Sequence, residues 1–431
     1  MKTTCYITSL IFIASSFFFS FPSSVFCQQV KQLETKNPDA DFIESLLKSH
    51  PKEFQNILSN SKKYEVQIIY TQINRDKNNV PSFKQYTYHL DPTNYFYPAS
   101  LVKLPCSAMA LEKLNHLNIP ALDKHTCMQT DSAYMCQRKI TKDTTALNKV
   151  PTVANYIKRM LLVSDNDAYS RIYEFLGQQY INEELNKKGY PNIRITHRFD
   201  ADCDTKQNKC TNQITFLDAG GKSVYNQPMV INTNELKNPI GVVKKGKGYI
   251  DGKGRLVREP KDYTFMNYMS LQDINDILKS ILFPGSIEKE KRFDLTKEDY
   301  TFLYKYMSMY PRESDYPGYN IKEFEDSYKK YFMYANFHKK IETDSVRIFN
   351  VVGQSYGNLA DCAYIVNLDR KIEFMLSAVI YVNEDGILND GKYEYKTIGF
   401  PFLDALGKVF YDYELKRKKN YLPNLSNFKL R

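Results

Sequence analysis

A serine and a lysine three residues apart, Ser100 and Lys103, are the residues of this chain best suited to covalent chemistry. They lie in the segment Pro98-Ala99-Ser100-Leu101-Val102-Lys103, where Pro98 favours the start of a helix. In the first turn of a helix the serine oxygen lies near free backbone amides, and a lysine at i+3 is on the same face. A lysine that desolvation keeps partly neutral can accept the serine proton, which makes the serine a nucleophile at neutral pH.

Sequence context separates Ser100 from the other serines that have a lysine three residues later. It follows an aromatic, extended stretch (95–97) and precedes an apolar helix, whereas the spacing alone recurs at Ser45, Ser49, Ser59, Ser286, Ser327 and Ser426. A second polar triplet, Ser164-Asp165-Asn166, occurs once in the chain and follows a predicted amphipathic helix. Serine and aspartate are also good helix N-caps, so the triplet can cap a helix and contribute to an active site at the same time.

The first 27 residues are typical of an export signal. Lys2 is their only charge, and a dense apolar run from residue 7 to residue 26 ends just before Cys27. We expect cleavage near Cys27 and a periplasmic or secreted protein; a lipoprotein anchored through Cys27 and a membrane anchor are the alternatives. No later stretch approaches the roughly 18 apolar residues that a membrane-spanning helix needs, so the mature chain is expected to have no transmembrane span.

Composition and charge indicate a globular protein that has no nucleic-acid partner. The 431 residues are 42% hydrophobic, enough for a large core, and the net charge of +10 comes from lysines and arginines spread along the chain. The basic runs at 244–247 and 416–419 are interpreted as solvated charge, and no nucleic-acid partner is expected. The sequence does not indicate the oligomeric state.

No cofactor and no metal are expected. The pattern Asp200-x-Asp202-x-Asp204 resembles the start of a calcium loop, but it lacks the required glycine and the final bidentate acid. The six cysteines that follow residue 27 permit disulfides in an oxidising compartment. Local bridges Cys127–Cys136 and Cys203–Cys210 fit the spacing, although the connectivity is open.

The hydrophobic periodicity predicts strand-rich ends around a helical middle. Strands are expected at 66–73, 83–90, 346–352, 360–369 and 371–383. Helices are expected from 98 onward through Leu114, and at 28–62, 151–163, 168–176, 271–282, 297–307, 321–340 and 400–415, with a loop-rich stretch at 190–265. The predicted fold class is α+β: a five-stranded antiparallel sheet built from both chain ends and flanked by helices, with an inserted, mainly helical lobe. The predicted division is a signal (1–27), an N-terminal helical segment (28–62) and one domain (63–431). Its sheet lobe comprises about 63–97 and 341–431, its helical lobe about 98–340, and Ser100 and Ser164 can meet in the cleft between them.

These motifs resemble those of the serine β-lactamase and penicillin-binding-protein superfamily, particularly the class A branch. Residues 98–103 resemble its first motif, Ser164-Asp165-Asn166 its second, and Val351-Val352-Gly353 occupies the place of the third, Lys-Thr/Ser-Gly. The resemblance implies a β-lactamase-like fold and roles for individual residues. Ser100 would be the nucleophile, Lys103 its base, and Ser164 the donor of a proton to the leaving nitrogen. Asn166 would hold Lys103 and the substrate amide, while Gly353 and Gln354 would form the substrate-binding strand. The backbone amides of Ser100 and Gln354 would form the oxyanion hole.

Two departures from the family pattern are visible in the sequence. Valine at 351 cannot supply the positive charge of the third-motif lysine, and Arg347 lies two strand steps away, each of about 6.6 Å. The stretch 194–204 offers Asp200, Asp202 and Asp204, but it has no glutamate to activate a deacylating water.

Two classes of function are consistent with these residues. The first is an exported serine hydrolase that forms an acyl-enzyme at Ser100 on a β-lactam or another small amide or ester. The second is a non-catalytic or poorly deacylating protein, similar to a penicillin-binding protein, that binds a peptidoglycan peptide or a protein partner. A penicillin-binding-like carboxypeptidase acting on peptidoglycan stems is a third, narrower possibility.

Overall fold

Five long antiparallel strands from the two ends of the chain form the central sheet, in the order β10-β11-β12-β1-β2. The first hairpin supplies β1 (Gln67–Arg75) and β2 (Pro81–Tyr88), and the C-terminal part supplies β10 (Val346–Ser355), β11 (Asn358–Asn367) and β12 (Ile372–Tyr381). Strand β1 pairs with β12, with Tyr70 opposite Leu376, so both ends close one sheet. The computed structural model thus confirms the predicted α+β class and its five-stranded sheet.

The structure describes residues 40–134, 136–336, 340–342 and 345–429, all within the unit Pro38–Arg431. The predicted signal (1–27), Cys27 and the first part of the predicted helical segment (28–62) lie outside the described residues. Within that segment the described residues 40–62 are helical but divided into short helices, because Pro51 starts a new helix after His50. None of the helices in the described residues is long and apolar enough to cross a membrane.

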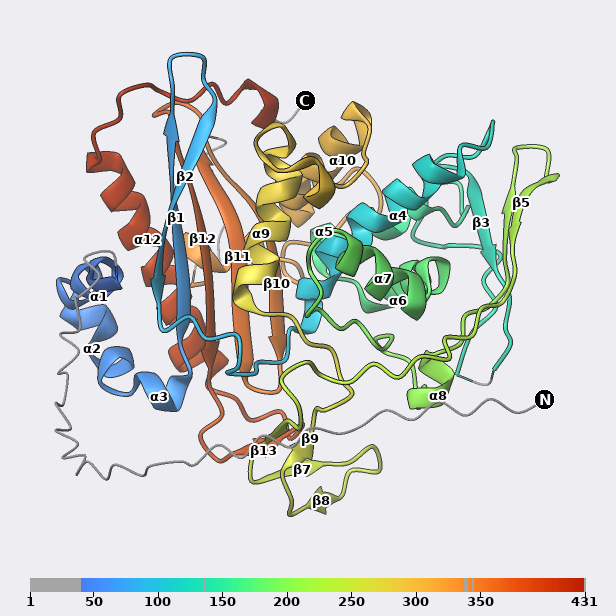
Figure 1. Ribbon diagram of the computed structural model, residues 1–431, viewed down its shortest axis with the longest axis horizontal. Helices are drawn as coiled ribbons and strands as arrows, with labels where there is room; N and C mark the ends of the chain where they lie inside the picture. Colours follow the sequence, from blue (N-terminus) through green and yellow to red (C-terminus); the bar gives the residue numbers. More distant parts are fainter. Residues whose placement is uncertain (1–39, 135, 337–339, 343–344, 430–431) are drawn as a thin grey trace, which may run out of the picture. The chain divides into compact units, whose positions relative to one another are not determined.

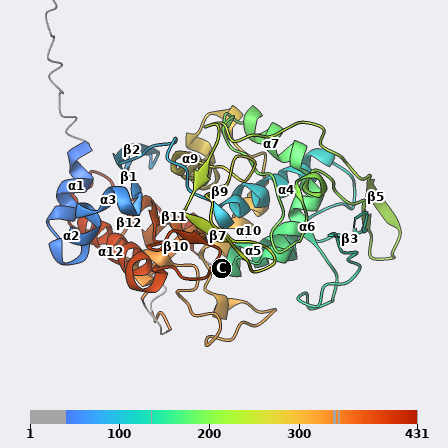
Figure 2. The ribbon, with the colours of Figure 1, turned by 90° about the horizontal axis from the view of Figure 1, so that it is seen from below.

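Helices cover both faces of the sheet and create two hydrophobic cores (Figures 1 and 2). One face packs against α1 (Ala40–Lys48), α2 (Pro51–Ser59), α3 (Ser61–Tyr64) and α12 (Phe400–Lys416). The other face packs against α9 (Leu271–Leu282) and α10 (Lys297–Ser308). Next to these lie the helices of the inserted lobe, namely α4 (Lys103–Leu117), α5 (Val153–Val163), α6 (Asn166–Leu176) and α7 (Gln178–Lys187). Strand β10 is the sheet edge beside this lobe.

Small elements fill the remainder of the insertion. A three-stranded sheet contains β3 (Cys127–Thr130), β4 (Ile214–Leu217) and β5 (Ser223–Gln227). Another joins β7 (Gly248–Ile250) and β8 (Leu256–Val257) to β13 (Ile387–Leu388), and β6 (Lys244–Lys245) pairs with β9 (Lys261–Asp262). The described residues also contain the short helix α8 (Thr205–Asn208), a π-helical turn at Tyr395–Gly399, and 3-10 turns at Ala99–Val102, Pro284–Ser286, Lys289–Lys291, Pro311–Glu313 and Ser426–Phe428. The region 190–265 is loop-rich, as expected.

The expected helix at 321–340 is wrong for the residues that the structure describes there. Turns occupy most of this stretch, and its one helical turn, α11 (Tyr331–Tyr334), contains an extended Phe332 and a left-handed Met333. The physical reason is that the Asp361 carboxylate accepts hydrogen bonds from the backbone amides of Tyr331 and Phe332, which fixes a non-helical backbone. A tertiary contact therefore overrides the local helical periodicity.

The local disulfides that fitted the sequence spacing are also wrong. Cys136 is bonded to Cys203, with their Cα atoms 5.1 Å apart, whereas Cys127 and Cys210 are free thiols. Cys127 lies in β3, where its backbone pairs with Leu217, and this pairing separates it from Cys136. The fold thus brings together two loops that are 67 residues apart.

We predict that Cys136→Ser lowers the free energy of unfolding by about 2–4 kcal/mol, because a cross-link over a long loop restricts the unfolded chain. Urea unfolding without reductant measures the change. Cys127→Ser is the matched control, since it removes a thiol that has no disulfide partner. Equal stability losses in the two variants, or peptide mapping that links Cys127 to Cys136, would contradict the assignment.

Candidate active site

Ser100 and Lys103 lie in a tight turn that leads into α4. Residues Ala99–Val102 form a 3-10 turn, and Ala99 has a left-handed φ of 47°. Such a φ is unfavourable for a residue with a side chain, so packing against neighbouring elements must hold it. The turn leaves Ser100 partly exposed and buries Lys103, which is 1% exposed.

The Lys103 amine lies at the centre of a cluster of hydroxyl and carbonyl groups. Its Nζ is 2.9 Å from Ser100 Oγ and 3.1 Å from Ser164 Oγ. It also donates hydrogen bonds to Asn166 Oδ1 at 2.6 Å and to the Ser164 carbonyl oxygen at 2.5 Å. The two carbonyl oxygens can only accept, so they take two N–H groups. In the neutral amine this leaves the lone pair for a hydroxyl proton.

Burial determines which protonation state Lys103 prefers. Desolvation, followed by the positive charge of Lys329, holds the pKa of Lys103 well below its ordinary value, against the attraction of Asp165 and Asp200. The aromatic ring of Phe199, 5.5 Å from Nζ, adds to the apolar surroundings. A lysine in this environment can be neutral near neutral pH and can accept a proton from Ser100.

The Ser164-Asp165-Asn166 triplet forms the sharp junction between α5 and α6. Ser164 ends α5 in the left-handed region (φ 57°), and Asp165 caps α6 by accepting from the Ala168 amide at 2.8 Å. The Asp165 carboxylate also pairs with Arg159 at 2.7 Å. The aspartate is therefore structural, and it holds the two neighbouring side chains toward Lys103.

The edge strand β10 lies directly against the turn that carries Ser100. A Cβ atom at Gly353 would lie 2.5 Å from the Pro98 carbonyl oxygen and 3.1 Å from Leu101 Cγ, so only glycine allows this approach. The next residue, Gln354, lines the same cavities as Ser100. The structure therefore brings Gly353 and Gln354 to the two motifs, as the family pattern implies.

The third-motif position itself holds no charge in this structure. Val351 is 1% exposed and packs in the core shared with the helical lobe. Arg347, on the same strand, is bound to Glu313 through two hydrogen bonds of 2.9 Å. Its guanidinium is thus held by a carboxylate and does not replace the missing lysine.

A lysine that the sequence analysis did not single out, Lys329, lines a cavity together with Ser100 and Ser164. Its side chain is buried, and its ammonium donates a hydrogen bond to the Leu161 carbonyl oxygen. Burial lowers the pKa of Lys329 to about 7, against the attraction of Asp361. The signal that the sequence offers is a pair of lysines between aromatic residues, Tyr328-Lys329-Lys330-Tyr331-Phe332, within the stretch 321–340 that was expected to be a helix.

Two cavities meet at Ser100, Asn166 and Gln354. The first has a volume of about 560 Å³, and Ser164, Lys329, Tyr331, Val352 and Lys396 contribute to its lining. The second has a volume of about 860 Å³, and Tyr97, His197, Phe199, Asp200, Lys261 and Tyr356 contribute to its lining. Both volumes fall in the range of small-molecule sites. Among the described residues, no group of three or more histidine, cysteine, aspartate or glutamate side chains is arranged to hold a metal ion.

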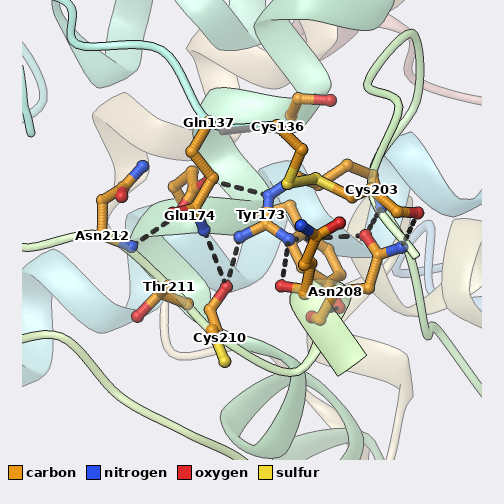
Figure 3. Close-up of polar contacts among 12 residues, drawn as sticks. Cys136, Gln137, Tyr173, Glu174, Cys203, Asn208, Cys210, Thr211 and Asn212 are labelled. Atoms are coloured by element: carbon orange, nitrogen blue, oxygen red, sulfur yellow. Dashed lines mark hydrogen bonds and ion pairs between the residues drawn. A yellow bond between two sulfur atoms is a disulfide. The ribbon is translucent and has the colours of Figure 1, made fainter. Parts of the chain in front are cut away.

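The wall of the second cavity is a loop fixed by buried polar contacts. Arg198, at its start, pairs with Glu174 of α6 at 2.7 Å, and both side chains are 2% exposed. Glu174 also accepts from the Asn212 amide, and the Cys136–Cys203 disulfide holds the middle of the loop (Figure 3). Of the three aspartates in the stretch 194–204, Asp200 is the one that acts electrostatically on Lys103. It is exposed at the surface of the cavity.

A serine–lysine turn and a Ser-Asp-Asn loop that meet beside the edge of a five-stranded sheet define a β-lactamase-like site. Residues 50–221 match the model of the Beta-lactamase2 family, described as "Beta-lactamase enzyme family", and this stretch contains both motifs. This stretch of the chain is similar to the β-lactamase enzyme family, and the resemblance inferred from its motifs is confirmed there. No curated protein matches the chain.

Solved β-lactamase structures align with most of the chain at low sequence identity. A β-lactamase from Xanthomonas campestris pv. campestris is 10% identical over 86% of this chain and 97% of that chain, with a TM-score of 0.46. One from Sphaerobacter thermophilus is 10% identical over 85% and 97%, with a TM-score of 0.45. A class A β-lactamase from Clostridium kluyveri is 12% identical over 83% and 97%, with a TM-score of 0.43.

We predict that Lys103→Arg lowers the rate at which a fluorophosphonate labels Ser100 by about 100-fold or more, because a guanidinium stays protonated and cannot accept the serine proton. In the unmodified protein the rate should rise with pH as Lys103 loses its proton, with a midpoint well below the ordinary lysine value. Lys113→Arg is the control, since Lys113 is a partly buried lysine of the same helix that contacts Phe175 and Gln227 instead. An unchanged pH profile in Lys103→Arg would show that Lys103 is not the base.

We predict that Gly353→Ala lowers the same labelling rate by about 100-fold, because the new Cβ displaces the turn before Ser100 by a fraction of an ångström or more. Gly252→Ala is the control, since a Cβ at Gly252 would meet no atom within 4 Å. Labelling kinetics and the melting temperature are measured for both variants. Full reactivity in Gly353→Ala would mean that the approach of β10 to Pro98 does not position Ser100.

Proposed function

We propose that this protein is an exported serine hydrolase of the β-lactamase type, which forms an acyl-enzyme at Ser100 on a β-lactam or another small amide or ester. The observation that carries the proposal is the buried Lys103 amine in contact with Ser100, Ser164 and Asn166. Few purely structural roles require an amine that is desolvated and directed at two hydroxyl groups. The apolar run before Cys27 supports export of the chain.

Acylation follows from the positions of these groups. Ser100 Oγ attacks the substrate carbonyl carbon while its proton passes to Lys103 Nζ, and the backbone amides of Ser100 and Gln354 stabilise the oxyanion. Collapse of the tetrahedral intermediate breaks the C–N bond. Ser164 then gives its proton to the leaving nitrogen and recovers one from Lys103, whose Nζ is 3.1 Å from Ser164 Oγ. The lysine ends neutral, and the ester at Ser100 remains.

A poorly deacylating protein, similar to a penicillin-binding protein, is the second candidate. The hydrogen bonds of Lys103 in the described part of the chain go to hydroxyl, amide and backbone oxygens and not to a carboxylate. Asp200 is the carboxylate of the 194–204 stretch that acts electrostatically on Lys103, and its side chain is exposed to solvent. An acyl-enzyme without a fixed base for water hydrolyses slowly, which would suit binding of a peptidoglycan peptide or a single acylation.

We predict that benzylpenicillin or a fluorophosphonate adds one acyl or phosphonyl group to the protein, and that Ser100→Ala abolishes the addition by both reagents. Intact-mass spectrometry over time measures the adduct. A benzylpenicillin adduct that forms and then decays supports the hydrolase, and a lasting adduct supports the second candidate. Absence of both adducts, or an adduct that persists in Ser100→Ala, would overturn the proposed function.

A further inference from the structure

We propose that Lys329 is a second lysine of the active site and binds the carboxylate of the substrate, so that the inserted segment supplies the positive charge that position 351 lacks. The inference rests on the proposed function and assigns a charge preference to its substrate. Lys329 lines the same cavity as Ser100 and Ser164, although it is far from both motifs in the sequence.

The hydrogen bonding of Lys329 leaves donors for a ligand. Among the described residues, the Leu161 carbonyl oxygen is the acceptor of its ammonium, and an ammonium carries three donors. Leu161 lies in the last turn of α5, just before Ser164, where the helix dipole favours a positive charge. A buried ammonium with unused donors beside a cavity is a built site for an anion.

The backbone that carries Lys329 is held by the sheet. Asn350 of β10 donates to the Lys329 carbonyl oxygen at 2.5 Å and to Asp361 Oδ1 at 2.8 Å. Asp361 of β11 accepts from the amides of Tyr331 and Phe332 at 3.1 and 3.2 Å. This network replaces the expected helix, and it aims the lysine into the cavity instead of into solvent.

The charged residues in the described part of the chain that line this cavity are two lysines, Lys329 and Lys396, and one carboxylate, Glu325, so positive charge is in excess. Lys103, Lys329 and Lys330 are all buried, and Asp361 is the buried carboxylate that attracts both Lys329 and Lys330. Lys330 uses its ammonium on Met307, Ile348 and Asn350 oxygens, so it is committed to the core. Lys329 is left to face the ligand.

A positive charge on Lys329 also acts on the base of the reaction. It lowers the pKa of Lys103, second only to burial, while Asp165 and Asp200 act in the opposite direction. A carboxylate bound by Lys329 would offset part of this repulsion, and burial, the largest cause, would still hold the pKa of Lys103 below its ordinary value.

The test compares benzylpenicillin with its methyl ester, which lacks the negative charge. We expect Lys329→Met to lower the rate of Ser100 acylation by benzylpenicillin about 30-fold, the loss of one charge-assisted hydrogen bond, and to change that of the ester less than threefold. The pH midpoint of labelling by a neutral fluorophosphonate should move upward, because Lys103 loses the repulsion of a like charge. Lys329→Arg should restore part of the preference for the free acid.

Lys396→Met is the matched control, because Lys396 is an exposed lysine that lines the same cavity. It should retain the preference for the free acid over the ester. A loss of this preference in Lys396→Met but not in Lys329→Met would overturn the inference, as would equal losses for the acid and the ester in Lys329→Met. Melting temperatures identify any variant that fails to fold, and in that case Lys329→Gln takes its place.

Equilibrium binding separates failure of this inference from failure of the proposed function. Calorimetry on Ser100→Ala, which cannot acylate, measures the affinities for benzylpenicillin and its ester with lysine or methionine at position 329. A preference for the acid that disappears with methionine supports the carboxylate site, even if the unmodified protein does not acylate. An acid and an ester that bind equally, or two ligands that do not bind at all, would overturn the carboxylate site.

Discussion

The burial of one amine, that of Lys103, is the constraint on which the active-site region depends. A buried ammonium without compensation costs several kcal/mol, so the surroundings must either provide acceptors or favour the neutral form. This structure does both, through the carbonyl oxygens of Ser164 and Asn166 and through desolvation. The left-handed residues Ala99 and Ser164 lie in the two turns that bring the Ser100 and Ser164 oxygens to that amine. The hydrogen bonds to the amine in turn stabilise both turns.

The two hydrophobic cores provide the rigidity that this arrangement needs. One core joins the inserted helices to the sheet, and the other fixes α12 and the N-terminal helices on the opposite face. Strand β10 lies at the boundary, and Gly353 lets its edge approach the Ser100 turn to a distance that any side chain would prevent. The site is therefore formed where the sheet edge meets the helical lobe, and neither part would suffice alone.

The sequence predicted correctly the elements whose conformation depends on the local residue pattern. Its predictions were wrong where contacts with residues distant in the sequence determine the structure. The alternating and helical periodicities located the five strands and most of the helices. The sequence context of Ser100 and of Ser164 predicted that these residues meet, and both contact Lys103 in the structure. The stretch 321–340 has a helical period, yet the Asp361 carboxylate captures its backbone amides. The Cys136–Cys203 bridge likewise joins two loops that no spacing rule connects.

The positions of Arg347 and Lys329 show why the missing cation could not be found by searching near the motif. Arg347 lies on β10, the strand that carries position 351. Glu313 accepts two hydrogen bonds from its guanidinium, so its positive charge is paired with a carboxylate of the protein. Lys329 is remote in sequence, but its ammonium is turned into the cavity and meets a backbone carbonyl. Whether a cationic side chain can bind a substrate carboxylate depends on whether a protein carboxylate already pairs with it, and not on its distance from the motif along the chain. If Lys329 has this role, a valine at position 351 is no defect, because a third lysine in the site would add a like charge to those of Lys103 and Lys329.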